Sequence, residues 1–352
     1  MEFGDGVGFL EELVSIPSPS GAEDGVAAYL VGRMGALGFD ARRDQAGNVV
    51  GRIGNPEAGR TIVLLGHMDT VPGRVPVRRS EGRLYGRGAV DAKGPLAAFV
   101  LAAAQAAPRL AGAQVVVIGA VEEETHARGA RHLARTMPPP QCAIIGEPSG
   151  WDGITLGYKG ALTVAYRLVQ PCGHSAGQRT GPAEQAVSFW NQLQAYTAAH
   201  NDGKSRRFHT LDPALRGFQT FSDGMEEGVE MHATVRLPPG ADGEDLRKQM
   251  QAWTNGARLS FHSNDPAFQA EKNTAPVRAL LRAIRAQGGR PRFKLKTGTS
   301  DMNVVGPAWG CPILAYGPGD SSLDHTPDEH IEIAEFQRGV EVLTQALTTL
   351  TG

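Results

Sequence analysis

Histidine and acidic side chains recur along this chain at places where they could hold a metal ion. His67 follows an apolar, β-rich run, and Asp69 comes two residues later, so both project from one face if the strand continues. An imidazole with a carboxylate at this spacing suits a metal ligand and the group that orients it. Similar side chains follow at Asp91, 122–124, Glu147 and His325.

A cluster of so many carboxylates needs compensating positive charge. Without cations, carboxylates that are packed together repel one another and take up protons instead. Two divalent ions about 3.5–4 Å apart, bridged by one carboxylate, remove this repulsion and supply a hydrolytic centre. Nitrogen and oxygen ligands favour Zn²⁺, with Co²⁺ or Mn²⁺ as alternatives.

The elements that would position these groups alternate between strand and helix. We expect strands at 48–53, 61–66, 115–120 and 142–145, and helices at 7–16, 22–37 and 94–107. This order is typical of an α/β fold in which a mostly parallel sheet has helices on both faces. Since the carboxyl ends of the strands in such a sheet share one crevice, several of the acids and histidines should converge there.

The pattern changes after the last of these strands. Residues 162–169 and 229–237 alternate between apolar and polar side chains, as in a sheet with one solvated face. We therefore predict a smaller α+β domain at 155–266, inserted in a catalytic domain that is formed by 1–154 and 267–352.

The composition excludes several classes of function. A formal net charge of −2 argues against bulk affinity for nucleic acid or for an anionic membrane. No leader and no long apolar stretch is evident, so we expect a soluble protein that is not exported. Three cysteines without a C-x-x-C pair indicate reduced thiols in a cytoplasmic protein.

Five segments together resemble one known family. They are Gly66-His67-Met68-Asp69, Tyr85-Gly86-Arg87-Gly88 with Asp91, the glutamates at 122–124, Gly146-Glu147-Pro148, and His325. In these segments the chain resembles the M20 family of co-catalytic zinc peptidases and deacylases, and the match covers nearly its whole length. The resemblance implies two zinc ions, with His67 and Glu147 on one, Glu124 and His325 on the other, and Asp91 between them.

The resemblance also implies the catalytic roles. Asp69 would orient His67, and Glu123 would be the general base that takes a proton from the water at the metal centre. The family usually shows Asp-Glu-Glu where this chain has three glutamates. The aligned register gives Glu123 as the base and Glu124 as the ligand, whereas a shift of one residue would make Glu122 the base and Glu123 the ligand.

The inserted domain would be the lid and dimerisation domain of this family, so the chain should form a homodimer. His174 matches a lid histidine that stabilises the oxyanion in a neighbouring active site. A loop that contains Thr299, Ser300 and Asp301 resembles one that lies near the carboxylate of the substrate. Arg236 occupies the basic position of a lid-strand motif.

One branch of the family matches in more detail, in residues 146–160 and 296–303. That branch hydrolyses the amide between the terminal glutamate γ-carboxyl of an acidic amino-group carrier protein and the α-amine of lysine or ornithine. The resemblance implies this activity, as the last step of lysine biosynthesis. Arginines at 74–87 and 128–135 could form a basic rim that attracts the carrier, or only a solvated face.

Three other interpretations remain. Within the family, the chain could deacetylate N-acetylornithine or N-acetyl-lysine, or desuccinylate succinyl-diaminopimelate. Outside it, the G-x-S-x-G match at 173–177 allows a serine hydrolase with Ser175 and His325, although this leaves the acidic cluster unexplained. A metal-binding scaffold without catalysis would need a lost base, yet Asp69 and Glu123 are both present.

Overall fold

The computed structural model describes residues 6–110, 112–174, 177 and 179–351. The chain separates into two compact units. The first consists of Met1–Gly157, Ala270–Leu295 and Ser300–Gly352, and the second of Tyr158–Gln269 and Lys296–Thr299. The short segment that contains Thr299 thus belongs with the second unit, and Ser300 and Asp301 belong with the first.

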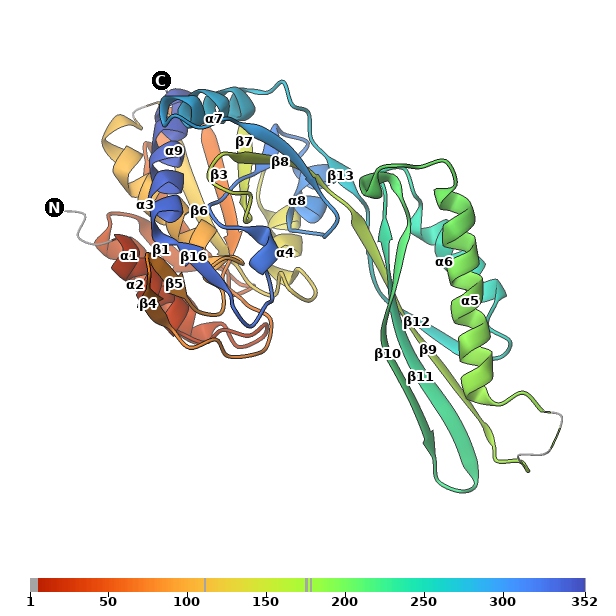
Figure 1. The fold of residues 1–352 in the computed structure, drawn as a ribbon. Coiled ribbons are helices and arrows are strands. Elements are labelled where there is room, and N and C mark those ends of the chain that lie inside the picture. The colour runs from red at the N-terminus through yellow and green to blue at the C-terminus, as the bar shows by residue number, and fades with distance from the viewer. Residues whose placement is uncertain (1–5, 111, 175–176, 178, 352) are drawn as a thin grey trace. The chain divides into compact units, whose positions relative to one another are not determined.

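The first unit contains a large mixed sheet (Figure 1). Its strands lie in the order β1 (Asp40–Arg43), β2 (Val49–Gly54), β6 (Gln114–Ala120), β3 (Thr61–His67), β7 (Cys142–Gly146), β15 (Ile313–Ala315) and β8 (Gly153–Tyr158). A further strand, β14 (Arg292–Lys296), also pairs with β8. The four central strands β6, β3, β7 and β15 are parallel, and β1, β2 and β8 pair antiparallel with their neighbours. This confirms the predicted α/β fold with a mostly parallel sheet.

The central strands are apolar along their whole length because helices cover the sheet. In β3 the side chains from Ile62 to Leu65 have no solvent exposure, as expected of a parallel strand that is buried on both faces. The helices of this unit are α1 (Gly6–Ser15), α2 (Asp24–Ala36), α3 (Lys93–Ala106), α4 (Arg128–Thr136), α7 (Ala275–Ala286), α8 (Met302–Trp309) and α9 (Ile333–Thr351). The alanine-rich α3 is almost entirely buried and packs against α9, since small side chains allow close approach.

A small sheet lies beside the main one. It contains β16 (His330–Glu332), β5 (Arg83–Tyr85) and β4 (Arg78–Ser80), in that order. The segment 73–90 therefore includes two short strands, β4 and β5. The pairing of β5 with β16 could not be predicted from the local sequence, because the two strands lie far apart in the chain.

The second unit is an antiparallel sheet with two helices. The strand order is β10 (Asp212–Ser222), β11 (Glu226–Leu237), β9 (Gly160–Pro171) and β12 (Arg258–Asp265), and the helices are α5 (Pro182–Asn201) and α6 (Gly243–Ala252). Alternate residues of β9 and β11, such as Leu162, Val164, Val229 and Met231, share a core with both helices, as the alternating pattern indicated. Short β13 (Phe268–Gln269) lies at the end of the longer segment of this unit, Tyr158–Gln269.

Candidate metal centre

Three neighbouring parallel strands end at the candidate site. His67 is the last residue of β3, the glutamates at 122–124 follow β6, and Glu147 follows β7. Their register aligns His67 with Ala120 and Gly66 with Gly146, so the three ends lie level. The sheet topology therefore brings together the side chains that the sequence placed after strands.

His67 is buried between two carboxylates. Its Nε2 lies 3.2 Å from Oδ1 of Asp91, and its Nδ1 lies 3.0 Å from the carbonyl oxygen of Asp69 and 3.4 Å from Oδ1 of the same residue. Burial by itself would lower the pKa of His67, but the hydrogen bonds to Asp69 and Asp91 outweigh it and raise the pKa well above 6.5.

Asp91 lies between the two histidines. Its Oδ1 faces His67, and its Oδ2 lies 3.0 Å from Nε2 of His325. The same His325 nitrogen lies 3.0 Å from Oε1 of Glu124. Burial would raise the pKa of Asp91, but hydrogen bonds from the two imidazoles lower it below its ordinary value. A carboxylate with one oxygen toward each histidine has the arrangement that a bridging ligand needs.

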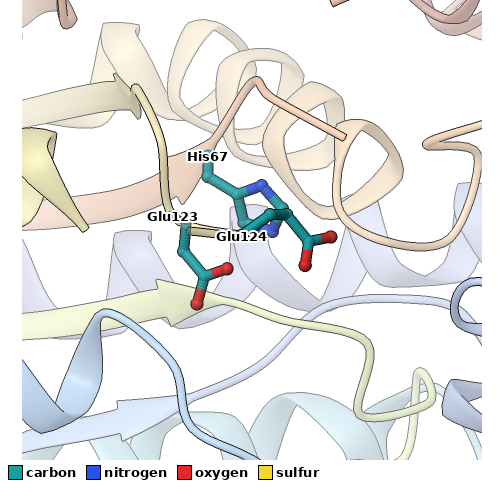
Figure 2. Close-up of side chains that lie close together, drawn as sticks. All are labelled: His67, Glu123 and Glu124. Carbon is teal, nitrogen blue, oxygen red and sulfur yellow. The ribbon is translucent and has the colours of Figure 1, made fainter. Parts of the chain in front are cut away.

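Asp69 holds the turn that carries the glutamates. Its Oδ1 accepts the backbone N–H of Glu123 at 3.0 Å, and its Oδ2 accepts that of Glu124 at 3.1 Å. It also accepts a hydrogen bond from the hydroxyl of Ser20 at 2.7 Å. Figure 2 shows the resulting cluster of His67, Glu123 and Glu124 at the end of the strand. Asp69 thus connects the imidazole with the acidic turn.

The donor set fits a pair of divalent ions. Two groups have their donor atoms within 4.8 Å of one another: one is His67, Glu123 and Glu124, and the other is Asp91, Glu124 and His325. Both offer imidazole nitrogen and carboxylate oxygen, the donors that Zn²⁺ and related ions prefer. Glu147 lies outside these two groups, although it is buried and its charge acts on Glu123.

Glu123 has the electrostatic character of a proton acceptor. Burial is the largest cause that raises its pKa well above 4.5, and the charges of Glu147, Asp301 and Glu124 add to it, while His67 opposes them. A carboxylate with a raised pKa is a better base near neutral pH than an ordinary one.

Glu122 differs from its two neighbours. Its Oε1 accepts a hydrogen bond from Nε of Arg128 at 2.8 Å, and its backbone adopts a positive φ of 57°. Its carbonyl accepts the N–H groups of His126 and Ala127, which closes a turn. Its side chain is thus engaged by a helix outside the metal cluster, unlike those of Glu123 and Glu124.

Two buried or partly buried supports of the site were not singled out in the sequence. Glu329 has no exposure, accepts the backbone N–H groups of Gly88, Val90 and Asp91, and pairs with Arg87 at 2.6 Å. Ser20 lies in the loop between α1 and α2 and donates its hydroxyl to Asp69. The role of Glu329 could not be predicted from the local sequence, because its hydrogen-bond partners lie far away in the chain. The sequence offers only its position, four residues after His325.

The candidate substrate residues are divided between the two units. In the second unit, Nη1 of Arg236 donates to Oγ1 of Thr299 at 3.0 Å, and His174 is exposed. In the first unit, Ser300 and Asp301 are buried. Ser175, the nucleophile of the serine hydrolase alternative, lies outside the described residues.

The arginines that were suggested as a basic rim mostly have partners within the chain. Arg79 pairs with Glu11 at 2.6 Å, Arg83 with Glu332 at 2.6 Å, and Arg87 with Glu329. Arg78 lies over the ring of Tyr85, 3.6 Å from its centroid. The ion pairs with glutamates offset much of the positive charge that would attract an acidic partner.

Comparisons with known proteins agree with this geometry. The model of peptidase family M20/M25/M40 matches residues 63–349. The LysW-lysine hydrolase of Deinococcus radiodurans is 45% identical over 97% of this chain and 96% of its own length. A putative LysW-lysine/LysW-ornithine hydrolase of Pyrococcus furiosus is 39% identical over 97% of this chain and 96% of its own.

A solved structure shares the whole fold. The M20 family metallo-carboxypeptidase of Sulfolobus solfataricus superposes with a TM-score of 0.82 over 99% of each chain, at 19% identity. Among the described residues, no helix is long and apolar enough to cross a membrane.

Proposed function

Because the chain belongs to peptidase family M20/M25/M40, we propose that it is a metal-dependent hydrolase that releases lysine from an amino-group carrier protein. The bond cleaved is the amide between the γ-carboxyl of the carrier's terminal glutamate and the α-amine of lysine, with ornithine as a second leaving group. The names of the two relatives, which align over nearly the full chain, support this substrate.

The observation that carries the proposal is the pair of donor groups that share Glu124. Asp91 faces both histidines, so one carboxylate could serve two ions. We assign His67, Asp91, Glu124, Glu147 and His325 as the residues that hold the two ions, and Zn²⁺ as the metal, with Co²⁺ as a substitute. When bound, the ions would polarise the scissile carbonyl and make water more acidic.

The chain's own residues supply the proton transfers. The Glu123 carboxylate takes a proton from the attacking water and returns it to the leaving α-amine, for which its raised pKa is suited. Asp69 fixes the position of this base by accepting its backbone N–H and that of Glu124. The contact between Glu122 and Arg128 supports Glu123 as the base and Glu124 as the ligand.

We assign the second unit a role in substrate binding and in self-association. In the second unit, Arg236 and Thr299 hydrogen bond to each other, and we assign both to substrate binding. Ser300 and Asp301, which belong to the first unit, are assigned the same role separately. His174 would stabilise the oxyanion. The edge strand β10 leaves Leu215, Phe218 and Phe221 exposed, and an apolar edge of this kind is suited to pairing with a second copy. The mass in solution, measured by light scattering for the protein and for Phe218→Lys, tests the homodimer.

We also place the protein in the cytoplasm, since its cysteines, Cys142, Cys172 and Cys311, are all free thiols. Fractionation of cells tests this assignment. An exclusively extracellular location would contradict it.

The deciding experiment compares two substrates. Release of lysine from the carrier–lysine conjugate is measured beside deacetylation of N-acetylornithine, each before and after chelation and after zinc is added back. Fast, chelator-sensitive release from the conjugate alone is the expected result. Activity on the small substrate alone would instead make the enzyme a deacetylase with the same metal centre. Turnover that resists chelation would contradict the metal mechanism.

A further inference from the structure

One segment of the chain carries charge of a single sign. Residues 272–299 contain eight lysines and arginines and no aspartate or glutamate, although the whole chain has a net charge of −2. Such an excess of one charge in a near-neutral protein creates a local field that can attract an oppositely charged partner.

The helix α7 displays three of these eight basic side chains on one face. Arg278, Arg282 and Arg285 are exposed and are spaced four and three residues apart, so they share one side of the helix. The opposite side, with Leu280 and Ile284, is buried in the core. The helix is therefore fixed in the first unit by its apolar side and presents the arginines to solvent.

The charge continues after the helix. Arg290 is exposed, and Arg292 at the start of β14 pairs with Asp152 at 2.7 Å. In the same strand Phe293 remains 49% exposed. We define Arg278, Arg282, Arg285, Arg290 and Phe293 as the α7–β14 surface. Arginine next to an exposed aromatic side chain is the composition that protein interfaces favour.

In the described part of the chain, most arginines of this surface are not neutralised by ion pairs. Within the described ranges, Arg282, Arg285 and Arg290 form no ion pair. The nearby acid Asp152 is already paired with Arg292, and Oε1 of Glu335 accepts the backbone N–H groups of Trp151 and Gly319. This distinguishes the surface from the arginines at 79–87, whose charges are paired within the chain.

We propose that the α7–β14 surface docks an acidic protein, which on the proposed function is the carrier that bears the substrate. Complementary charge would raise the rate of encounter and hold the partner in one orientation. Two segments connect this region with candidate site residues. β14 leads into the loop that contains Asp301, and Asp152 lies on the loop that begins at Glu147. A partner bound here is thus held next to segments that carry site residues.

The test reverses charge on α7. Steady-state kinetics on the carrier–lysine conjugate and on γ-glutamyl-lysine, a small compound with the same scissile amide, are compared for the wild type and for Arg282→Glu/Arg285→Glu. The matched control is Arg42→Glu/Arg109→Glu, which reverses two exposed arginines elsewhere in the first unit. We expect KM for the conjugate to rise by about tenfold in the α7 variant, with kcat unchanged. The control variant and all turnover of the small substrate should match the wild type.

Salt provides a second readout. The wild-type KM for the conjugate should rise with ionic strength, and the α7 variant should lose most of this dependence. A KM within about twofold of the wild type, or an equal loss in the control variant, would overturn the docking surface.

Failure of the proposed function gives a different result. In that case the wild type does not turn over the conjugate at all. Calorimetric titration with the unconjugated carrier then tests whether the α7–β14 surface binds the carrier, independently of turnover. Binding that the α7 variant loses would support the surface without the hydrolase activity, and absence of binding to the wild type would overturn both.

Discussion

In the first unit, β3, β6 and β7 are buried on both faces and end level with one another, whereas in the second unit β10 is exposed over most of its length. The parallel strands gather His67, the glutamates and Glu147 at one edge, because every strand points the same way. The antiparallel sheet cannot gather side chains in this manner and leaves an open edge instead. The two sheet topologies therefore differ in what they present: converging side chains at the strand ends of the first unit, and an open strand edge in the second.

The sharpest test of this division is removal of the base. Glu123→Gln should keep its metal and lose turnover by a factor of about 10²–10⁴, since an amide cannot accept the proton. Glu122→Gln, whose wild-type side chain pairs with Arg128, is the matched control and should stay close to wild type. Metal content by elemental analysis accompanies the kinetics. The reverse result would assign the base to Glu122 and shift the register by one residue.

Metal removal should affect the two units unequally. A ligand that binds only the folded state at about 1,000 times its Kd stabilises that state by about 4 kcal/mol. Chelation should therefore increase amide hydrogen exchange in β3, β6 and the turn at 121–127 by up to about a thousandfold. Exchange in β9 and β11 should hardly change. Equal acceleration in both units would mean that they unfold as one body.

Glu329→Gln should weaken metal binding without unfolding the first unit. Its carboxylate holds the N–H of Asp91 and the guanidinium of Arg87, and loss of such support typically costs about 10–100-fold in metal affinity. Competition with a chelator measures this loss, and the melting temperature of the metal-free protein reports any structural damage. Glu332→Gln, at a half-exposed pair with Arg83, serves as the control. Unchanged affinity would reduce Glu329 to a purely structural residue.

The smallest effect concerns pH. Hydrogen bonds to Asp91 and Glu124 raise the pKa of His325 to about 10, so without metal its imidazole holds a proton at neutral pH. Metal must displace that proton, and apparent affinity should rise with pH by about tenfold per unit for each proton released. Titration with a competing chelator at several pH values measures the slope.

The raised pKa of His325 also makes the stability of the metal-free protein depend on pH. A raised pKa stabilises the metal-free fold below the pKa of an unfolded histidine, and this contribution is lost as pH rises through about 10. A metal affinity that does not depend on pH would contradict the protonated state of His325.

Much of the candidate site could be predicted from the sequence because several of its groups follow strands that are recognisable locally. His67 and Glu147 each end or follow an apolar run, and strand ends converge in an α/β sheet. The sequence alone could not decide whether Glu122 or Glu123 is the candidate base, since the direction of these side chains depends on a turn with a positive φ at Glu122. The same limit applies to Glu329, whose backbone partners lie about 240 positions earlier.

The arginines at 74–87 also show that contacts between distant segments could not be predicted from the sequence. A run of basic residues at 74–87 suggested a charged rim, but Glu11, Glu329 and Glu332 return from distant segments to pair with it. Three of the eight basic residues at 272–299 lie on a regular helix whose opposite face is apolar. The sequence pattern of α7 therefore predicts a helix with a basic exposed face, which is formed by the arginines at 278, 282 and 285.

The positive charge of residues 272–299 is balanced by an acidic excess in the rest of the chain. The remaining residues carry ten more acidic than basic side chains, although the molecule as a whole is close to neutral. Near its isoelectric point of about 6.6, the basic region of one molecule can associate with the acidic remainder of another. Solubility should therefore be lowest in dilute buffer near that pH and should increase when salt is added.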